Sequence, residues 1–435
     1  MPKVRIKIRR QKTSASYDIL VEEGLMKRIP ALLKKNPAGQ KYAIICDQGS
    51  AKLRGKKLLA DLKAKGLKAD ILTFEGGDRS KNLKTVEKLL HELAGRRFSR
   101  KDAVIALGGG VAGDIAGFTA SVYMRGIPFI QVPTTLLAMA DSSIGGKTGV
   151  NLADGKNLVG TFCQPRTVFI DTSTLKTLPP EEMVNGMSEI VKSAIIADRK
   201  FFDYLSDNAN KFWHRNTNFL NKIIIQGCKI KASVVEKDEK ENGRRMILNF
   251  GHTLGHALEK VSDYKIPHGR AVAVGMKVMN EICQKKSLVN KKDYSRIKKL
   301  ISIYKLTDGF DTGLISKKNW KEIWTAMQND KKNVNSTVRF VIVRQIGKAT
   351  TYEKISKEDL FEALASYHGD KSRKCTGFQN RSTRLQKLHQ PCASACSARR
   401  GKKYDCSSAG KRGYPGNAQR AEKTGGSMGK KQHRN

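Results

Sequence analysis

Short apolar runs alternate with amphipathic stretches across residues 41–171, and this alternation most constrains the fold. The stretches at 51–65 and 83–95 have the apolar spacing of helices that bury one face. Strands that alternate with helices of about 10 to 15 residues are typical of βαβ units and a parallel sheet. The predicted strands comprise residues 41–47, 69–74, 102–110, 128–135 and 167–171. We therefore expect an α/β domain with a parallel, Rossmann-like sheet.

The pattern changes after residue 177, where longer helical periodicities replace the strand signals. Residues 181–196 and 221–240 are predicted helices, and one late hairpin precedes a final predicted helix at 357–367. At the start of the chain, the runs VRIKI and YDILV predict an antiparallel hairpin. The expected parts are an α/β domain at 1–177, a mostly α-helical domain at 178–368 and a basic tail at 369–435 of disordered composition.

The chain carries 82 Lys and Arg against 40 Asp and Glu, a net charge of +42. The tail holds 17 basic and 3 acidic residues, so it carries +14 and the two domains carry +28. Such an excess suits nucleic acid, an anionic surface or an acidic small substrate. The aromatic content of 7% is not interleaved with basic residues, which argues against a nucleic-acid module. The tail remains open to three interpretations: nucleic-acid binding, a native disordered extension, or the product of a shifted reading frame.

Other classes are excluded by what the composition lacks. No apolar run reaches the roughly 18 residues of a membrane span, and the start MPKVRIKIRR lacks the apolar stretch of a signal peptide. The eight cysteines include no CxxC pair and follow no regular spacing, so a disulfide framework is not expected. We expect a cytoplasmic protein with reduced thiols.

The string GGGVAGD at 108–114 directly follows a predicted strand and opens a predicted helix. Glycines let backbone N–H groups approach a phosphate, and a helix N-terminus adds a partial positive charge. Asp78 and Lys81 follow another strand, at the sheet edge where doubly wound folds bind ligands. The string differs from GxGxxG, so a tight turn without a ligand remains the alternative to a nucleotide site.

Residues 131–162 are rich in small and hydroxylated side chains and contain Lys147, Lys156 and Asn157. Lysines provide point charges for phosphate or carboxylate, and Ser, Thr and Asn bind hydroxyls. The segment therefore predicts a loop that wraps an anionic, polyhydroxylated ligand. A solvated surface loop is the alternative.

Three of the eight histidines lie within 17 positions, at His252, His256 and His268. The first two are four residues apart on one helix face, a spacing that resembles HExxH, but Thr253 stands where that motif needs Glu. Neutral imidazoles are good zinc ligands, and Glu189 is a candidate acidic ligand. Core histidines with satisfied hydrogen bonds remain the alternative to a metal site.

Several longer strings follow one another in order between residues 47 and 332: GGGVAGD, YMRG, QVPTTLLAMADSSIGGKTGVN, GKNLVG, NGMSEIVK, KASVVEKDE, LNFGHTLGHA, PHG and NDKK. Together they resemble the 3-dehydroquinate synthases, sugar-phosphate cyclases of the shikimate pathway. The resemblance implies an N-terminal NAD-binding domain, a helical C-terminal domain, an active site between them and a homodimer.

The resemblance also implies the chemistry, that of an NAD- and zinc-dependent carbon-oxygen lyase, with cobalt as an alternative metal. Its substrate would be 3-deoxy-D-arabino-heptulosonate 7-phosphate, and its products 3-dehydroquinate and phosphate. The implied steps are transient oxidation by NAD, phosphate elimination, re-reduction and intramolecular aldol closure.

Site residues follow from the positions that match the family. The implied zinc ligands are Glu189, His252 and His268. The implied NAD contacts are Asp47, Asp78, Lys81, Gly109, Gly110, Asp114, Thr134, Thr135, Lys147, Lys156 and Thr177. The implied catalytic residues are Lys147, Lys192, Lys231, Asn249 and His256. The implied substrate contacts are Arg125, Asp141, Lys156, Asn157, Arg245 and Lys331, or Lys332 in place of Lys331. Arg125 is expected to act from the partner subunit.

Two other enzyme classes compete with this interpretation. A metal-dependent polyol dehydrogenase shares the Gly-rich turn and a helical metal domain, but its substrates lack the phosphate that the lysines would bind. Other sugar-phosphate cyclases are closer, yet they typically alter positions that match Lys231, Asn249 or His256, and all three are intact here.

Overall fold

The computed structural model describes residues 16–239, 243–310, 317–328, 338–352 and 354–365. These residues lie in one compact unit, Met1–Ser372. The basic tail and Lys331 lie outside the described residues, so what was expected of them stays a prediction.

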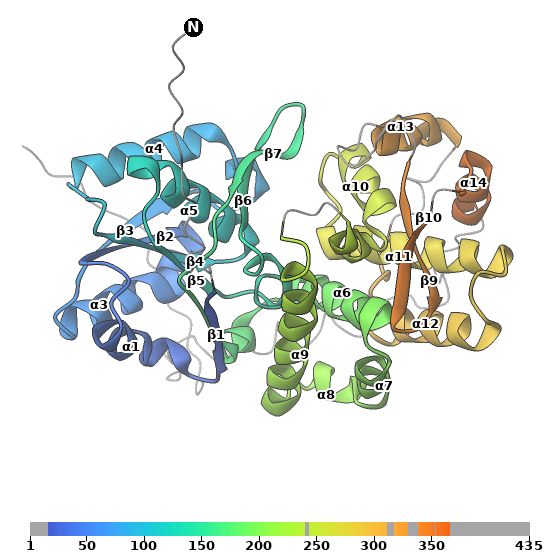
Figure 1. Cartoon of the computed structure of the whole chain (residues 1–435), viewed down its shortest axis with the longest axis horizontal. Helices are drawn as coiled ribbons and strands as arrows, with labels where there is room; N and C mark the ends of the chain where they lie inside the picture. The colour runs from blue at the N-terminus through green and yellow to red at the C-terminus, as the bar shows by residue number, and fades with distance from the viewer. Residues whose placement is uncertain (1–15, 240–242, 311–316, 329–337, 353, 366–435) are drawn as a thin grey trace, which may run out of the picture. The chain divides into compact units, whose positions relative to one another are not determined.

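Six parallel strands form one sheet in the N-terminal half of this unit (Figure 1). The strands are β1 (Asp18–Glu22), β2 (Lys41–Asp47), β3 (Lys68–Phe74), β4 (Ala103–Gly108), β5 (Phe129–Pro133) and β8 (Thr167–Asp171). Their order is β1-β8-β5-β4-β2-β3, with parallel pairing throughout. This confirms the expected α/β class. The YDILV run supplies β1, whereas its predicted hairpin partner VRIKI lies outside the described residues.

Helices cover both faces of the sheet, as a parallel sheet requires (Figure 1). One face packs against α4 (Leu83–Gly95) and α5 (Gly110–Val122), and the other against α1 (Ile29–Lys35) and α3 (Lys56–Ala64). The central strand β4 is buried along its whole length. Helix α4 has the predicted bounds because the Asn82 side chain caps it, accepting the backbone N–H of Thr85 at 3.0 Å.

Part of the segment that was predicted to be a loop is instead a hairpin of β6 (Lys147–Leu152) and β7 (Gly155–Phe162). Gly149 and Gly160 face each other across it, and a Cβ on Gly160 would lie 2.1 Å from the carbonyl oxygen of Thr148. The small residues that made the segment look like poor core material thus allow close approach of two strands. The expectation of a loop here is wrong for these residues.

The C-terminal half is mostly helical, which confirms the expected class. Its helices include α6 (Pro180–Ala197), α7 (Arg199–Asp207), α8 (Ala209–Trp213), α9 (Thr217–Val235), α10 (His252–Val261), α11 (His268–Lys285), α12 (Lys291–Ile303), α13 (Lys317–Gln328) and α14 (Lys357–Ala365). Helix α6 is buried along most of its length within one hydrophobic core. The predicted late hairpin is β9 (Phe340–Gln345) with β10 (Lys348–Tyr352). The domain boundary predicted after residue 177 falls between the 3-10 helix η6 (Thr172–Thr177) and α6, and stays a prediction.

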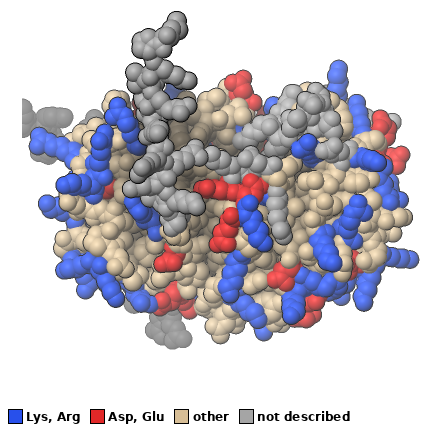
Figure 2. All heavy atoms as spheres, in the orientation of Figure 1, with Lys and Arg blue, Asp and Glu red and all other residues tan. Residues whose placement is uncertain are grey.

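The face of the molecule shown in Figure 2 carries basic and acidic side chains together. Figure 2 shows Lys and Arg scattered over the visible face, with Asp and Glu among them. Such a mixture differs from the continuous basic stripe that tracks a nucleic-acid backbone. Among the described helices, none is both long and apolar enough to cross a membrane.

Candidate active site

The order of the strands places a switch point at the carboxyl edge of the sheet, where a ligand-binding crevice is expected. Strand β4 leads to β5 on one side, whereas β2 leads to β3 on the other, and β2 and β4 are neighbours. Ligands of doubly wound folds bind at such a switch point, outside the carboxyl ends of the strands. Asp47 ends β2 and Gly108 ends β4, so these two residues flank the crevice.

The Gly-rich turn after β4 needs glycine first at Gly108. Its φ is +148°, and a Cβ there would lie 2.7 Å from the Cβ of Ala112. Gly109 is the N-cap of α5 and Gly110 its first residue, so the unpaired N–H groups of the first turn are accessible to an anion. Gly108 belongs to the predicted Gly-rich string at 108–114, although only Gly109 and Gly110 were expected to contact NAD.

Other predicted nucleotide contacts lie at or after the carboxyl ends of the strands. Asp47 accepts hydrogen bonds from the backbone N–H and the hydroxyl of Ser50, at 2.9 and 2.6 Å. The N–H of Thr134 donates to the carbonyl of Gly108 at 2.9 Å, which ties the end of β5 to the Gly-rich turn. The hydroxyl of Thr135 accepts the N–H of Ala138 at 3.2 Å. Thr177 lies at the end of η6, where it accepts a hydrogen bond from Arg54 at 2.7 Å.

Lys81, which follows β3, contacts both helix α5 and the hairpin of β6 and β7. Its ammonium contacts the carboxylate of Asp114 on α5 and the side-chain oxygen of Asn157 on β7. Burial raises the pKa of Asp114 despite the opposing effect of Lys81. The structure therefore brings together three predicted site residues from three segments that are distant in sequence.

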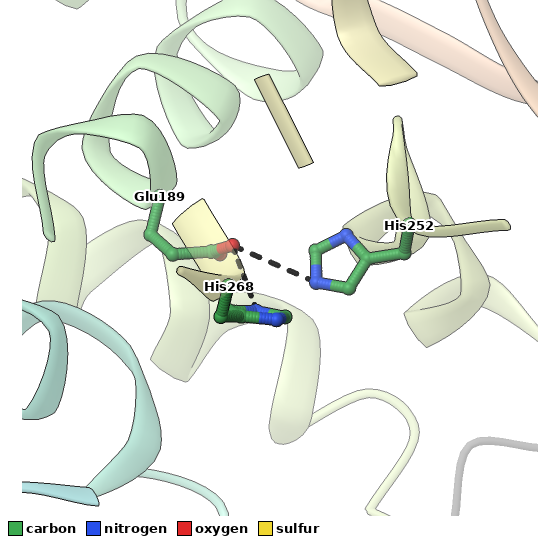
Figure 3. Close-up of side chains that lie close together, drawn as sticks. All are labelled: Glu189, His252 and His268. Carbon is green, nitrogen blue, oxygen red and sulfur yellow. Dashed lines mark ion pairs between the residues drawn. The ribbon is translucent and has the colours of Figure 1, made fainter. Parts of the chain in front are cut away.

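A second cluster lies in the helical half (Figure 3). Glu189 lies on α6, His252 is the first residue of α10, and His268 is the first residue of α11. Glu189 Oε1 lies 3.6 Å from His252 Nε2 and 3.7 Å from His268 Nε2. Ligand atoms about 2.0 to 2.2 Å from a tetrahedral metal ion are about 3.3 to 3.6 Å apart, so small side-chain adjustments suffice.

The environment of Glu189 also fits a metal ligand. The residue is 1% exposed, and among the described residues neither carboxylate oxygen has a hydrogen-bond partner. Lys192, three residues along α6, forms an ion pair with it. Burial alone would raise the pKa of Glu189, but the charge of Lys192 holds it below its usual range. A buried, ionised carboxylate beside two imidazoles is suited to bind a divalent cation.

His268 has a second carboxylate neighbour, Glu259, which the sequence analysis missed. Glu259 Oε2 lies 3.1 Å from Nδ1 of His268. Burial alone would lower the pKa of His268, but the neighbouring carboxylates of Glu189 and Glu259 raise it to about 10. Burial opposes ionisation of Glu259 too, yet the hydrogen bond from His268 lowers the pKa of Glu259 to about 2. The signal in the sequence was its position three residues after His256, on the same helix.

His256 lies beside the cluster without completing it. Its ring centroid is 5.3 Å from that of His252 and 5.9 Å from that of His268. Nitrogen or oxygen atoms of His256, Glu259 and His268 also lie within 4.8 Å of one another, which makes a second candidate metal set that shares His268 with the first.

Lysines approach this region from both halves of the unit. Lys231 on α9 lies 2.6 Å from Asp141 Oδ1, in the short π-helix η5 (Ala138–Ser142). Burial lowers the pKa of Lys231 against the attraction of Asp141, whereas Lys231 and Lys192 hold the pKa of Asp141 well below normal despite burial. Lys156 on β7 lies 3.3 Å from Asp78 and 3.1 Å from Glu259.

Other predicted site residues lie on further elements. Arg245, in the 3-10 helix η7 (Arg244–Asn249), is 2% exposed, and its guanidinium donates to the carbonyls of Glu239 and Gly145. Asn249 ends η7, and Lys147 begins β6. Arg125 ends the 3-10 helix η4 (Tyr123–Arg125) with φ of 67°. Their roles stay predictions.

The crevice and the Glu-His-His cluster are together the features of an enzyme that pairs a dinucleotide with a divalent metal ion. Residues 71–185 match the family described as 3-dehydroquinate synthase N-terminal, and residues 186–333 match 3-dehydroquinate synthase C-terminal. A 3-dehydroquinate synthase from Desulforamulus reducens is 40% identical over 351 residues, which cover 80% of this chain and 97% of the relative. The chain belongs to the 3-dehydroquinate synthase family.

Two solved cyclases share the fold. The 2-epi-5-epi-valiolone synthase of Streptomyces hygroscopicus, with NAD+ and Zn2+ bound, has a TM-score of 0.75 at 24% identity, covering 83% of this chain and 98% of that one. A 2-deoxy-scyllo-inosose synthase, complexed with carbaglucose-6-phosphate, NAD+ and Co2+, has a TM-score of 0.71 at 29% identity, covering 80% and 95%. The valiolone synthase supports the fold alone. Both solved proteins carry NAD+ with a divalent metal.

Proposed function

We propose that this chain converts 3-deoxy-D-arabino-heptulosonate 7-phosphate to 3-dehydroquinate and phosphate, with NAD reduced and reoxidised in each turnover. The observation that carries the proposal is the largely buried Glu-His-His cluster with Lys156, Lys192 and Lys231 around it, in a chain of this family. The substrate bears a phosphate and a carboxylate, and a site with three lysines suits both anions.

Glu189, His252 and His268 would hold zinc, or cobalt in its place, since their donor set and spacing fit a site with three protein ligands and one open position. When bound, such an ion supplies Lewis acidity to a substrate oxygen, and NAD supplies a hydride acceptor. The chain's task is then to orient the substrate and to move protons.

Different side chains would transfer protons and bind the substrate. Lys231 has a pKa lowered by burial, which suits it to give or take a proton while Asp141 holds it in place. His256 lies beside both imidazoles of the cluster and would serve proton transfer near the reacting carbons. The other proposed contacts to substrate are Lys147, Lys156, Asn157, Lys192, Arg245, Asn249 and Lys331.

NAD would lie across the crevice at the switch point. Its pyrophosphate would contact the N-terminal turn of α5 at Gly109 and Gly110. Asp47 ends β2 and Asp78 follows the neighbouring strand β3, at the edge where a carboxylate binds ribose hydroxyls. The remaining proposed contacts are Lys81, Asp114, Thr134, Thr135, Lys147, Lys156 and Thr177.

A homodimer is the proposed assembly, with Arg125 reaching the partner's active site. Met124 and Arg125 both have positive φ, 47° and 67°, a strained turn of the kind found where a side chain must be presented. Large apolar side chains are exposed at the same end of α5 and on the nearby hairpin: Val122, Met124, Leu152, Leu158 and Phe162. Mixing inactive Arg125→Ala with inactive Lys231→Met should restore activity, because a mixed dimer holds one intact site. No recovery, with dimers proven by light scattering, would overturn the role across the interface.

Metal removal tests the proposed activity. Chelator treatment of the full chain should abolish release of phosphate and dehydroquinate, and added Zn2+ or Co2+ should restore both. A chelated protein that keeps full activity, or a metal-loaded protein that forms neither product, would contradict the proposal.

A further inference from the structure

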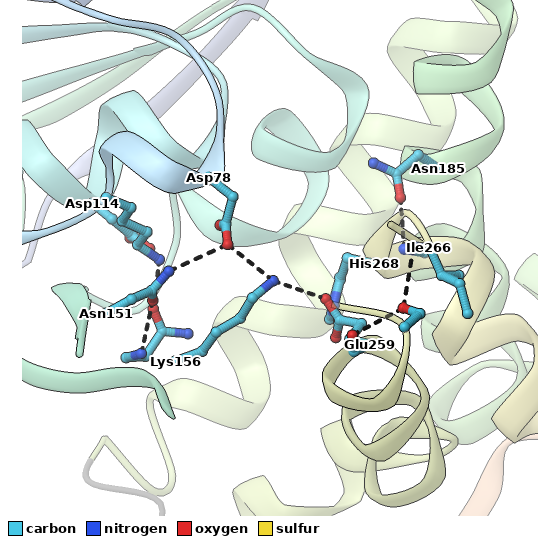
Figure 4. Close-up of polar contacts among 12 residues, drawn as sticks. Asp78, Asp114, Asn151, Lys156, Asn185, Glu259, Ile266 and His268 are labelled. Atoms are coloured by element: carbon cyan, nitrogen blue, oxygen red, sulfur yellow. Dashed lines mark hydrogen bonds and ion pairs between the residues drawn. The ribbon is translucent and has the colours of Figure 1, made fainter. Parts of the chain in front are cut away.

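One carboxylate links the candidate metal centre to the α/β half (Figure 4). Glu259 Oε2 contacts Nδ1 of His268, and Glu259 Oε1 contacts Nζ of Lys156, both at 3.1 Å. Lys156 also contacts Asp78 at 3.3 Å and lies 4.1 Å from the ring centroid of Tyr264. The contacts form a chain from the loop after β3, through the hairpin, to the first residue of α11.

Glu259 lies where a charged carboxylate is unfavourable unless neighbouring groups pair with it. The residue is 2% exposed, and an unpaired buried charge is costly. It also lies in the last turn of α10, where the helix dipole disfavours a negative charge. Both of its oxygens are used, one by an imidazole and one by an ammonium. The contacts it makes therefore offset two separate penalties.

Glu259 contacts His268 at Nδ1, whereas the other ring nitrogen, Nε2, is the one near Glu189. A carboxylate at Nδ1 keeps the proton on that nitrogen and leaves Nε2 as the metal donor. Nε2 is the atom that lies 3.7 Å from Glu189 Oε1. The same carboxylate fixes the ammonium of Lys156, which the proposed function assigns to NAD and substrate.

We propose that Glu259 is a positioning residue that sets the tautomer and ring orientation of His268 and couples the metal centre to Lys156. This inference rests on the proposed function. Metal affinity should then depend on Lys156, because Lys156 and His268 contact the same carboxylate. Lys156 itself lies in the opposite half and touches no proposed metal ligand.

The test measures metal affinity rather than turnover. Full-length Glu259→Gln is titrated with Co2+ by visible absorption, and with Zn2+ in competition with a chromophoric chelator. Loss of such a carboxylate partner lowers metal affinity roughly 10- to 100-fold. Glu259→Asp, which keeps the charge on a shorter arm, should recover part of the loss. Glu281→Gln removes a carboxylate on α11 that pairs with Tyr294 and Lys298, and should leave the affinity unchanged.

The coupling is tested with Lys156→Ala and the double variant. Lys156→Ala should weaken Co2+ binding a few-fold, and its effect should vanish in the Glu259→Gln background. Equal Co2+ affinity in Glu259→Gln and the parent protein would overturn the inference, as would fully additive effects. The Co2+ coordination spectrum of Glu259→Gln could also change as much as that of Glu189→Gln. Such a change would mean that Glu259 is itself a metal ligand, which would overturn the inference. A parent protein that neither binds Co2+ nor releases phosphate would instead defeat the proposed function.

Discussion

The two halves of the candidate site are built on different principles. The crevice of the α/β half is shaped by backbone: a glycine with positive φ, the first turn of α5 and the ends of parallel strands. The cluster of the helical half is made of buried charged side chains from α6, α10 and α11. Backbone N–H groups suit a diphosphate at fixed geometry, whereas paired charges suit a cation and proton transfer. Substitutions in the two halves should therefore affect different binding properties of the protein.

The largest expected effect is on the metal. Glu189→Gln keeps the shape of the side chain and removes its charge, so zinc affinity should fall roughly 100-fold or more, given the several kcal/mol that each ligand contributes. Chelator competition measures this. Glu181→Gln, on an exposed first-turn position of the same helix, should leave affinity unchanged. Equal affinities for both variants would remove Glu189 from the metal centre.

Metal binding should depend steeply on pH. In the metal-free protein, burial opposes protonation of His268, but the two neighbouring carboxylates raise its pKa to about 10. Because the metal must displace this proton, affinity should rise by about tenfold per pH unit between neutral pH and that value. Calorimetry in buffers of different ionisation enthalpy should show release of one proton. Affinity that does not change with pH would mean that His268 is already neutral or is not a ligand.

Removal of Lys231 should cost stability as well as turnover. Lys231→Met leaves the carboxylate of Asp141 without its nearest cation, and because that carboxylate is partly exposed, the unfolding free energy should fall by about 2 kcal/mol rather than more. The pKa of Asp141 is depressed in the folded protein, so the lost stability is that present above its unfolded pKa. Urea unfolding at neutral pH measures the loss.

The double variant Lys231→Met with Asp141→Asn is the control for this pair. It should recover stability without recovering turnover, since the unpaired charge is removed but the proton-transfer group is not restored. If the single variant is as stable as the parent protein, the pair is not a structural ion pair.

The smallest expected effect belongs to the backbone-built half. Gly108→Ala forces a side chain onto a residue with φ of +148° and against Ala112, which should destabilise the protein by about 1 kcal/mol and weaken NAD binding. Metal affinity should not change. Gly95→Ala, at the end of α4 with open space around it, should be neutral or stabilising. An equal loss of NAD and metal affinity in Gly108→Ala would contradict the division between the two halves.

Sequence patterns predicted the elements whose signals are local. The strand at 167–171 and the helix at 83–95 were predicted with the bounds they have, because apolar spacing and the Asn82 cap lie within each segment. The hairpin of β6 and β7 was missed because its pairing depends on the facing glycines Gly149 and Gly160, which look like loop residues when read along the chain.

The site was predictable where a residue type alone suggests its chemistry. His252 and His268 attract attention as imidazoles, although only the packing of α10 against α11 brings them together. Glu259 was missed because a Glu in an amphipathic helix resembles an ordinary surface residue until the fold buries it. The engagement of Arg245 with backbone carbonyls depends on a loop path that no local pattern encodes.

The most direct test of the account compares phosphate release with NADH in one incubation. The metal-loaded protein is mixed with the heptulosonate phosphate and much less NAD than substrate, and phosphate and NADH absorbance are followed together. We predict that phosphate is released until the substrate is consumed, with dehydroquinate formed in equal amount and no accumulation of NADH. Phosphate release limited to the amount of NAD, or NADH that accumulates with turnover, would contradict the account.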